Sequence, residues 1–141
     1  MVPNVPEKLD SDTSSLSEAF AADLLRGHTE TIVLAILSRE DSYGFEIFKT
    51  IRDANGGSYE IKEATLYASY RRLLNDGLVE AYWGDETQGG RRKYYRITDA
   101  GRAVYRDNVQ AWVVTRGIID SLLDLDQRPG LRDPRPGRQR S

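Results

Sequence analysis

The chain has 141 residues, 39% of them hydrophobic and 30% charged, with a formal net charge of −2 at pH 7. This composition favours one soluble globular domain, and the lack of cysteine and the single histidine, His28, exclude disulfides, thiolate chemistry and a multi-histidine metal site. No apolar stretch approaches the ~20 residues needed to span a bilayer and the N-terminus does not resemble a signal peptide, so we expect a cytoplasmic protein without a metal or cofactor.

Both ends of the chain are predicted to be tails outside the folded part. Residues 1–15 contain two prolines and a cluster of Ser, Asp and Thr, and residues 127–141 contain three prolines and five arginines. Neither segment has enough apolar residues to form a core, and the prolines of 127–141 prevent a helix. The arginine-rich tail is interpreted as a solvated end, with a non-specific arm for polyanions as the weaker alternative.

Apolar residues at helical spacing predict three helices in the first half of the chain. The first covers roughly 18–39 and is expected to be disturbed at Gly27, the second covers 43–54, and the third runs from 63 to 75. Between the second and the third, the segment SYEI at 58–61 is long enough only for a strand fragment.

The third helix combines an apolar face with polar and basic positions. Its apolar stripe follows the spacing i, i+4, i+7 and i+8 and consists of Leu66, Tyr70, Leu73 and Leu74. Thr65 and Ser69 fall outside this stripe, so we expect these short side chains on the exposed face. Arg71 and Arg72 bring positive charge to the same helix.

A two-stranded hairpin is predicted after the third helix. The segments LVEAYWG at 78–84 and KYYRIT at 93–98 alternate and are rich in aromatic and β-branched residues, as paired strands are. The turn between them ends in Gly89 and Gly90, which permit positive φ angles and a close backbone approach. The tip then carries three cations, Arg91, Arg92 and Lys93. The neighbouring aromatic residues are interpreted as packing residues: Trp83, Tyr94 and Tyr95.

The last helix is predicted from Thr98, an expected N-cap, to about Leu125. It carries two adjacent apolar stripes, the first formed by Ala111, Ile118, Leu122 and Leu125 and the second by Trp112, Ile119 and Leu123. This surface is broader than one small neighbour needs to cover, so a partner helix is implied.

The order helix, helix, short strand, helix and hairpin is typical of a winged helix-turn-helix, a mainly α fold with a small β-hairpin (α+β). We assign residues 16–98 to this domain and 99–126 to a C-terminal dimerisation helix. In this architecture a helix enters the major groove of DNA and the hairpin tip lies along the backbone or minor groove. A DNA contact explains why a slightly acidic chain gathers cations at a glycine-rich tip.

Residues 63–101 resemble the PadR-type transcriptional regulators in the motifs ATLY, RRL, DGL, YWGDETQGGRRKYYR and TDAG, and YGFEI at 43–47 resembles the start of that family's second helix. The resemblance extends from about Leu24 to Leu125, and the single long C-terminal helix is similar to the subgroup that includes multidrug-responsive repressors. It implies a homodimer that binds a palindromic site in double-stranded DNA. The residues expected to contact DNA are Tyr43, Thr65, Ser69, Arg71, Arg72, Gly89, Gly90, Arg91, Arg92 and Lys93.

The same resemblance implies a ligand site at the dimer interface, where Trp112 would stack on planar aromatic compounds. Glu30, Thr31 and Arg116 are expected beside it. The dimer interface itself is expected to comprise Leu24, Val109, Ala111, Ile118, Ile119, Leu122 and Leu125. Packing of Trp112 in the dimer core without any ligand is the alternative.

A ligand-responsive homodimeric repressor is therefore the leading hypothesis. The alternative is a winged-helix adaptor that binds proteins without operator binding, and the arginines of the wing argue against it because such a module would not need them. An enzyme is not expected, since the sequence has no nucleotide-binding loop and no catalytic constellation is left without cysteine and with one histidine.

Overall fold

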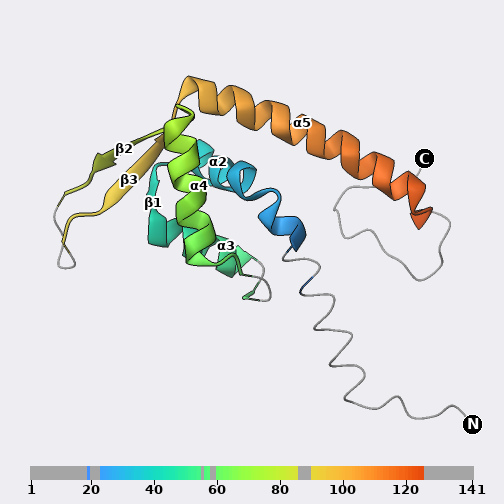
Figure 1. Ribbon diagram of the computed structural model, residues 1–141, viewed down its shortest axis with the longest axis horizontal. Helices are drawn as coiled ribbons and strands as arrows, with labels where there is room; N and C mark the ends of the chain where they lie inside the picture. Colours follow the sequence, from blue (N-terminus) through green and yellow to red (C-terminus); the bar gives the residue numbers. More distant parts are fainter. Residues whose placement is uncertain (1–18, 20–22, 55, 58–59, 86–89, 126–141) are drawn as a thin grey trace, which may run out of the picture. The chain divides into compact units, whose positions relative to one another are not determined.

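The computed structural model describes residues 19, 23–54, 56–57, 60–85 and 90–125, and the chain divides into two units, Met1–Arg106 and Asp107–Ser141. The elements, in chain order, are α2 (Thr29–Arg39), β1 (Ser42–Tyr43), α3 (Gly44–Ala54), α4 (Glu63–Asn75), β2 (Val79–Trp83), β3 (Lys93–Ile97) and α5 (Asp99–Leu122) (Figure 1). The predicted fold, mainly α with a small β-hairpin, is confirmed.

The first predicted helix is interrupted at Gly27, as expected. Residues 23–26 are helical, a turn follows at Gly27 and His28, and α2 begins at Thr29. The hydroxyl of Thr29 donates a hydrogen bond to the carbonyl oxygen of Arg26 at 2.9 Å, which joins the two helical pieces across the turn. The side chains that α2 buries in the core are Val33, Leu34 and Leu37.

The sheet has three antiparallel strands in the order β1-β3-β2. The hairpin of β2 and β3 is confirmed, with Val79 opposite Ile97 and Trp83 opposite Lys93. The third strand, β1, was not predicted, and Tyr43 belongs to it rather than to the following helix. A two-residue strand has too little sequence to show an alternating pattern, and it forms here because Ser42 and Tyr43 pair with β3.

The prediction of a strand fragment at 58–61 is wrong for residues 60 and 61. Residues 60 and 61 lie outside any strand, and positions 58 and 59 fall outside the described residues. Ile61 is nevertheless buried in the core, directly before α4. The apolar character of this segment therefore comes from packing and not from strand pairing.

Helix α4 has the predicted bounds, and its apolar stripe is buried. Leu66, Tyr70 and Leu73 are almost fully enclosed, and Leu74 is half-buried. The hydroxyl of Tyr70 donates a hydrogen bond to the carbonyl oxygen of Gly44 at 2.9 Å, and its ring centroid lies 5.0 Å from that of Tyr95. Tyr70 therefore fixes α4 against both α3 and the sheet.

A set of hydrogen bonds joins the end of α4 to the start of α5. The hydroxyl of Thr98 accepts a hydrogen bond from the N–H of Gly101 at 3.0 Å, which confirms the predicted N-cap. The same hydroxyl donates to the carbonyl oxygen of Gly77 at 2.7 Å, and the N–H of Thr98 donates to that of Leu78 at 3.1 Å. Gly77 has a φ of 72°, which favours glycine.

Helix α5 ends at Leu122, three residues before the predicted end, and Asp124 has a φ of 56°. Beyond residue 107 it exposes many large apolar side chains: Val109, Trp112, Val113, Val114, Ile118, Ile119 and Leu122, with Leu123 just after its end. Ala111 is also exposed and Leu125 is half-buried. Nothing within this unit covers the apolar stripes among the described residues.

Two glycines of α5 have opposite surroundings. A Cβ atom at position 101 would overlap the carbonyl oxygen of Leu78, whereas a Cβ atom at position 117 would meet nothing within 4 Å. We expect Gly101→Ala to lower the free energy of unfolding by about 1–3 kcal/mol through overpacking. Gly117→Ala should instead raise it by about 0.5–1 kcal/mol, because alanine favours the helix. Urea unfolding at one fixed protein concentration measures both, and equal effects would contradict the assigned contact.

Candidate nucleic-acid interface

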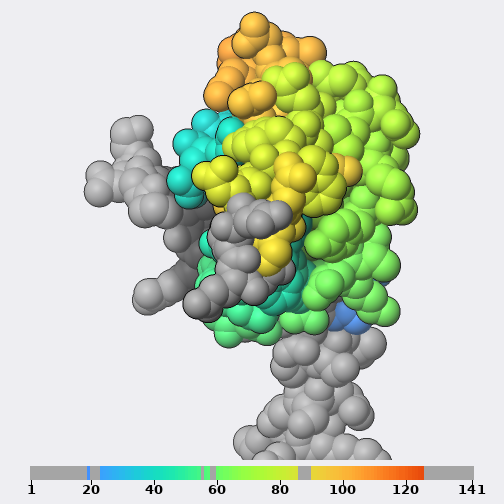
Figure 2. Space-filling model, turned by 90° about the vertical axis from the view of Figure 1, so that its left-hand side faces the viewer, coloured from blue at the N-terminus to red at the C-terminus, as the bar shows by residue number. Residues whose placement is uncertain are grey.

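The hairpin of β2 and β3, here called the wing, presents two faces because side chains alternate along a strand. Tyr95 and Ile97 point into the core, and Tyr94 and Arg96 lie on the opposite face. Figure 2 looks onto the wing, with its strands in yellow and α4 in green beside them. The wing and α4 are thus open to the solvent on one common side.

Three tyrosines form an aromatic cluster on the outer face of the sheet, in which Tyr94 is edge-on to Tyr43 and stacked on Tyr82. The ring centroid of Tyr94 lies 5.4 Å from that of Tyr43 and 5.6 Å from that of Tyr82. Gly84 is required here, since a Cβ atom at this position would lie 2.5 Å from the ring of Tyr94. The hydroxyl of Tyr82 donates to the carboxylate of Asp41 at 2.5 Å, and this hydrogen bond raises the pKa of Tyr82.

Each cation of the wing lies over an aromatic ring. The distances from the charged group to the ring centroid are 5.6 Å for Arg91 on Trp83, 4.6 Å for Arg92 on Tyr43, 5.9 Å for Lys93 on Tyr95 and 4.9 Å for Arg96 on Tyr82. Of these cations, only Arg96 forms an ion pair with a carboxylate among the described residues, with Glu80 at 3.2 Å. The other three are held by rings, which leaves their charge available to an anion.

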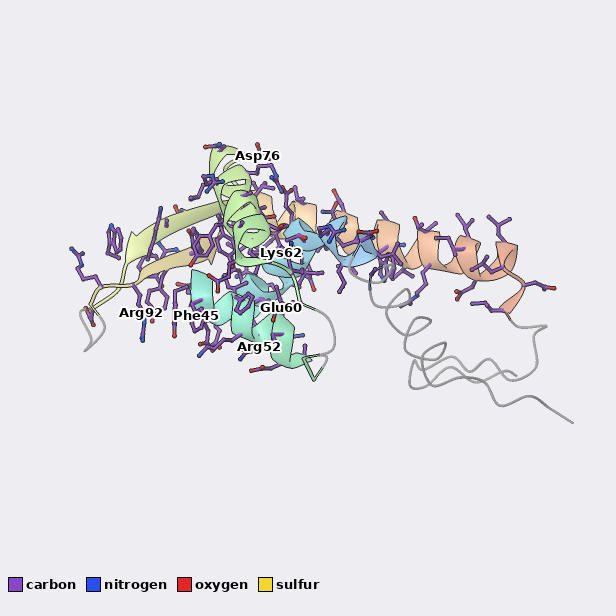
Figure 3. All side chains as sticks on the ribbon, turned by 60° about the horizontal axis from the view of Figure 1, so that its bottom comes forward. Phe45, Arg52, Glu60, Lys62, Asp76 and Arg92 are labelled. Carbon is purple, nitrogen blue, oxygen red and sulfur yellow. The ribbon has the colours of Figure 1, made fainter. Side chains whose placement is uncertain are left out.

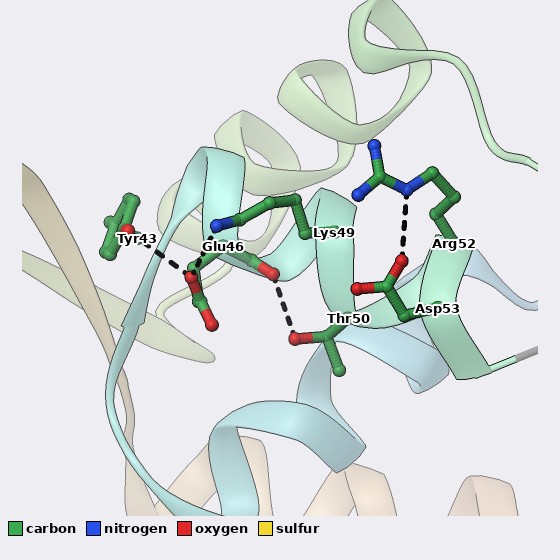
Figure 4. Close-up of polar contacts among 6 residues, drawn as sticks. All are labelled: Tyr43, Glu46, Lys49, Thr50, Arg52 and Asp53. Atoms are coloured by element: carbon green, nitrogen blue, oxygen red, sulfur yellow. Dashed lines mark hydrogen bonds and ion pairs between the residues drawn. The ribbon is translucent and has the colours of Figure 1, made fainter. Parts of the chain in front are cut away.

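The aromatic support under Arg92 is itself held in place. The hydroxyl of Tyr43 donates to Oε2 of Glu46 at 3.3 Å, and Nζ of Lys49 lies 3.4 Å from the same oxygen (Figure 4). Arg92 extends from the wing on the side where α3 lies (Figure 3). Gly90 is exposed with a φ of 91°, and Gly89 falls outside the described residues.

Ser69 was expected on the exposed face of α4, and this prediction is wrong. Its side chain is 0% exposed, because it lies three residues after Leu66 and four before Leu73 on the buried side of the helix. The hydroxyl of Ser69 donates to the carbonyl oxygen of Thr65 at 3.1 Å. Thr65 is half-buried, so neither short side chain stands freely in the solvent.

Tyr67 is a surface residue that the sequence interpretation missed. It is 40% exposed and lies four residues before Arg71, which is exposed on the same side of α4. Its ring covers Gly44, where a Cβ atom would lie 2.6 Å from the Tyr67 hydroxyl oxygen. The spacing to Arg71 could have revealed it. Tyr67 and Arg71 supply a hydroxyl and a charge at the outer surface of α4.

Tyr95 connects this surface of α4 to the wing. Burial, together with the nearby Tyr67, raises the pKa of Tyr95, and Arg71 acts in the opposite direction. Burial likewise raises the pKa of Tyr70. A tyrosine hydroxyl is neutral at physiological pH even at its ordinary pKa of about 10, and shifts in this direction keep both hydroxyls neutral, so neither adds a negative charge that would repel a phosphate.

Trp83 was interpreted as a packing residue, and this is also wrong. It is 57% exposed at the end of β2, and the guanidinium group of Arg91 lies 5.6 Å from the centroid of its ring. The prediction for the paired tyrosines is confirmed, since Tyr95 is buried and Tyr94 packs across the strands.

Two residues expected at different sites are brought together. Nε of Arg72, predicted to contact DNA, lies 2.6 Å from Oε1 of Glu30, predicted to lie near a ligand. Thr31 is half-buried beside Glu30 in α2. Trp112 and Arg116 belong to the second unit, where Trp112 is 42% exposed and Nε of Arg116 is buried without a hydrogen-bond partner among the described residues.

Chemically, this surface is suited to binding an anion through charge-assisted hydrogen bonds. In the part of the chain that is described, no cluster of three or more His, Asp or Glu side chains could hold a metal ion. None of the described helices combines the length and the apolar character needed to cross a membrane.

Comparison with known proteins identifies related chains. Residues 33–107 match the model of the transcriptional regulator PadR-like family. An uncharacterized protein of Lysinibacillus sphaericus is 43% identical over 103 residues, which cover 73% of this chain and 94% of that protein.

Solved structures agree with this match. A transcriptional regulator from Clostridium thermocellum is 42% identical with a TM-score of 0.66, covering 71% of this chain and 94% of that one. A PadR family transcriptional regulator from Eggerthella lenta is 32% identical with a TM-score of 0.69, covering 80% of this chain and 96% of that one.

Proposed function

The chain belongs to the PadR-like family of DNA-binding transcriptional regulators, and we propose that it is a homodimeric repressor released from a palindromic operator by a planar aromatic ligand. Members of this family are transcriptional regulators rather than enzymes, in agreement with the expectation from the sequence. We infer that it acts in the cytoplasm. The adaptor alternative is disfavoured because the wing retains its cations.

The observation that carries the DNA-binding proposal is the support of the wing cations by aromatic rings. A ring restricts the orientation of a guanidinium group without neutralising it, so less conformational entropy is lost when a phosphate binds. The N–H groups at the edge of the guanidinium remain available for bidentate hydrogen bonds. We assign phosphate contacts to Arg91, Arg92 and Lys93, and contacts in the major groove to Tyr67 and Arg71 of α4.

The dimer proposal is supported by the apolar surface of α5. Contiguous exposed apolar patches of this kind are rare on monomers and mark interaction sites. Leu24, in the helical piece before α2, is 55% exposed and is our candidate for a contact with the second copy. A two-fold axis would place each stripe of α5 against an equivalent surface, which is the usual closed arrangement of soluble oligomers.

The ligand proposal rests on Trp112. In a two-fold dimer this half-exposed indole occurs twice, so two rings could enclose a planar aromatic guest. Stacking would add about 0.5–1.5 kcal/mol to the effect of apolar burial. The alternative, in which Trp112 only fills the dimer core, predicts no such binding.

The wing assignment can be tested by replacing Arg91 and Arg92 with alanine. The reference DNA is a duplex that the wild-type protein selects from a random library. The double variant should bind more weakly both to this duplex and to duplexes of unrelated sequence. The slope of log K against log salt should flatten by about one unit for each lost phosphate contact. Arg96→Ala is the matched control, because this arginine lies opposite Glu80 at the base of the hairpin and not at its tip. Equal salt slopes for the wild type and the double variant would refute the assignment.

The dimer can be tested with Ile118→Glu, which places a charge on the exposed apolar stripe. A single chain should tolerate this change at the solvent-exposed position, whereas a covered interface should dissociate, because burying an unpaired charge is costly. Gln110→Glu makes a comparable change at an exposed polar position and should leave the dimer intact. Removal of residues 127–141 should also leave it intact. Sedimentation equilibrium gives the masses, and an Ile118→Glu dimer as stable as the wild type would argue against the interface.

The role of Trp112 can be tested by fluorescence with a planar acridine cation as the probe. We expect the probe to quench the tryptophan emission of the wild type and of Trp83→Phe. Trp112→Ala should abolish the quenching while it preserves the dimer and DNA binding. Dissociation of the Trp112→Ala dimer, together with no quenching of the wild type, would assign this indole to the core alone.

A further inference from the structure

Helices α2 and α4 are joined by an ion pair between residues 42 positions apart in the sequence. Oε1 of Glu30, in the first turn of α2, accepts a hydrogen bond from Nε of Arg72 at 2.6 Å. Arg72 lies in the last turn of α4. The pair therefore connects α2, where Glu30 and Thr31 are expected near a ligand, to α4, on which we place DNA contacts.

A second hydrogen bond fixes the same guanidinium group. Nη2 of Arg72 donates to the hydroxyl oxygen of Ser69 at 3.1 Å. Because the Ser69 proton is directed to the carbonyl oxygen of Thr65, a lone pair of the hydroxyl is left for Arg72. The burial of Ser69 conflicts with a direct DNA contact. Its hydroxyl instead holds the guanidinium group of Arg72 in place.

These two contacts leave one edge of the guanidinium group open. An arginine has five N–H donors, of which Glu30 and Ser69 each take one. The Arg72 side chain remains 57% exposed, although it is held at two points. A guanidinium fixed on one edge and open on the other is preorganised to receive a phosphate oxygen.

We propose that Glu30 is a positioning residue for DNA binding, which holds Arg72 in the orientation that contacts the DNA backbone. This inference rests on the proposed function, in which α4 contacts DNA, and on the phosphate contact that we expect from Arg72 in the last turn of that helix. It also supplies a route for induction. A cationic ligand that pairs with Glu30 would take the carboxylate from Arg72, and the arginine would lose its orientation while the DNA contact is weakened.

The direction in which Glu30→Gln changes the DNA affinity distinguishes a positioning role of Glu30 from a purely electrostatic one. Glu30 carries a negative charge, so its removal should strengthen binding to a polyanion if charge alone matters. If Glu30 positions Arg72, Glu30→Gln should instead weaken binding. An exposed ion pair of this kind corresponds to about a twofold to fivefold change in affinity.

The test is a double-mutant cycle with Glu30→Gln, Arg72→Gln and the double variant, on the duplex selected by the wild-type protein. We expect Glu30→Gln to weaken binding about twofold to fivefold. Arg72→Gln should weaken it further and flatten the salt slope by about one unit. The double variant should bind no worse than Arg72→Gln, because Glu30 acts only through Arg72. Urea unfolding should show little change for any of them, since the pair is exposed.

Reversal of the pair gives a second, independent measurement. The variant E30R/R72E restores an ion pair between α2 and α4 but presents a carboxylate where the guanidinium stood. If the pair only ties the two helices together, this variant should recover wild-type DNA affinity. We expect it to stay defective while its unfolding midpoint matches that of the wild type.

Three results would overturn the proposal: unchanged or stronger DNA binding by Glu30→Gln, additive effects in the cycle, or recovery of affinity in E30R/R72E. The wing variant Arg91→Ala/Arg92→Ala, measured on the same duplex, distinguishes this failure from failure of the proposed function. Loss of binding in the wing variant without an effect of Glu30→Gln would leave the repressor assignment standing. If neither the wing variant nor Glu30→Gln changed DNA binding, both the positioning role of Glu30 and the proposed function would be refuted.

Discussion

The hydroxyl of Tyr70 donates to the carbonyl oxygen of Gly44, and the arrangement of the DNA-binding unit depends on this contact. A phenol enclosed to this degree must have a hydrogen-bond partner, because an unsatisfied buried hydroxyl costs about 1–3 kcal/mol. The partner is a backbone group at the first residue of α3, so the bond sets the position of one helix start. The ring of the same residue lies against Tyr95. One side chain of α4 thereby determines where α3 and β3 lie relative to it.

How much of this could be predicted from the sequence depended on the range of the interactions involved. The bounds of α4 and the cap at Thr98 follow from local rules, namely an apolar stripe at helical spacing and a hydroxyl before a helix. Strand β1 depends on pairing with residues about fifty positions away, so a two-residue segment gave no signal. Ser69 and Trp83 were assigned the wrong exposure for a related reason. The exposure of a side chain is decided by neighbouring elements, and a helical projection of one segment does not contain them.

The chain treats its charges in two different ways. Arg72 of α4 and Arg96, at the base of the wing, lie beside carboxylates on neighbouring elements. At the tip of the wing, Arg91 and Arg92 lie on aromatic rings instead. A net charge of −2 therefore coexists with cations at the tip of the wing that lie on aromatic rings and have no ion pair with a carboxylate among the described residues. The net charge of a chain is therefore a poor guide to DNA binding when some of its arginines are paired with carboxylates and others lie on aromatic rings.

The passage from β3 to α5 consists of Thr98 alone. Its backbone N–H and its hydroxyl form hydrogen bonds with Gly77, Leu78 and Gly101, so the conformation of this one-residue connection is restricted. One inserted residue would turn every later residue of α5 by about 100° around the helix axis, since a helix has about 3.6 residues per turn. Length changes at this point should therefore be far rarer among related sequences than changes in the hairpin turn. The one-residue connection therefore fixes which side chains of α5 lie on each face of the helix. Substitutions in α5 preserve this assignment, whereas an insertion at Thr98 would change it for the whole helix.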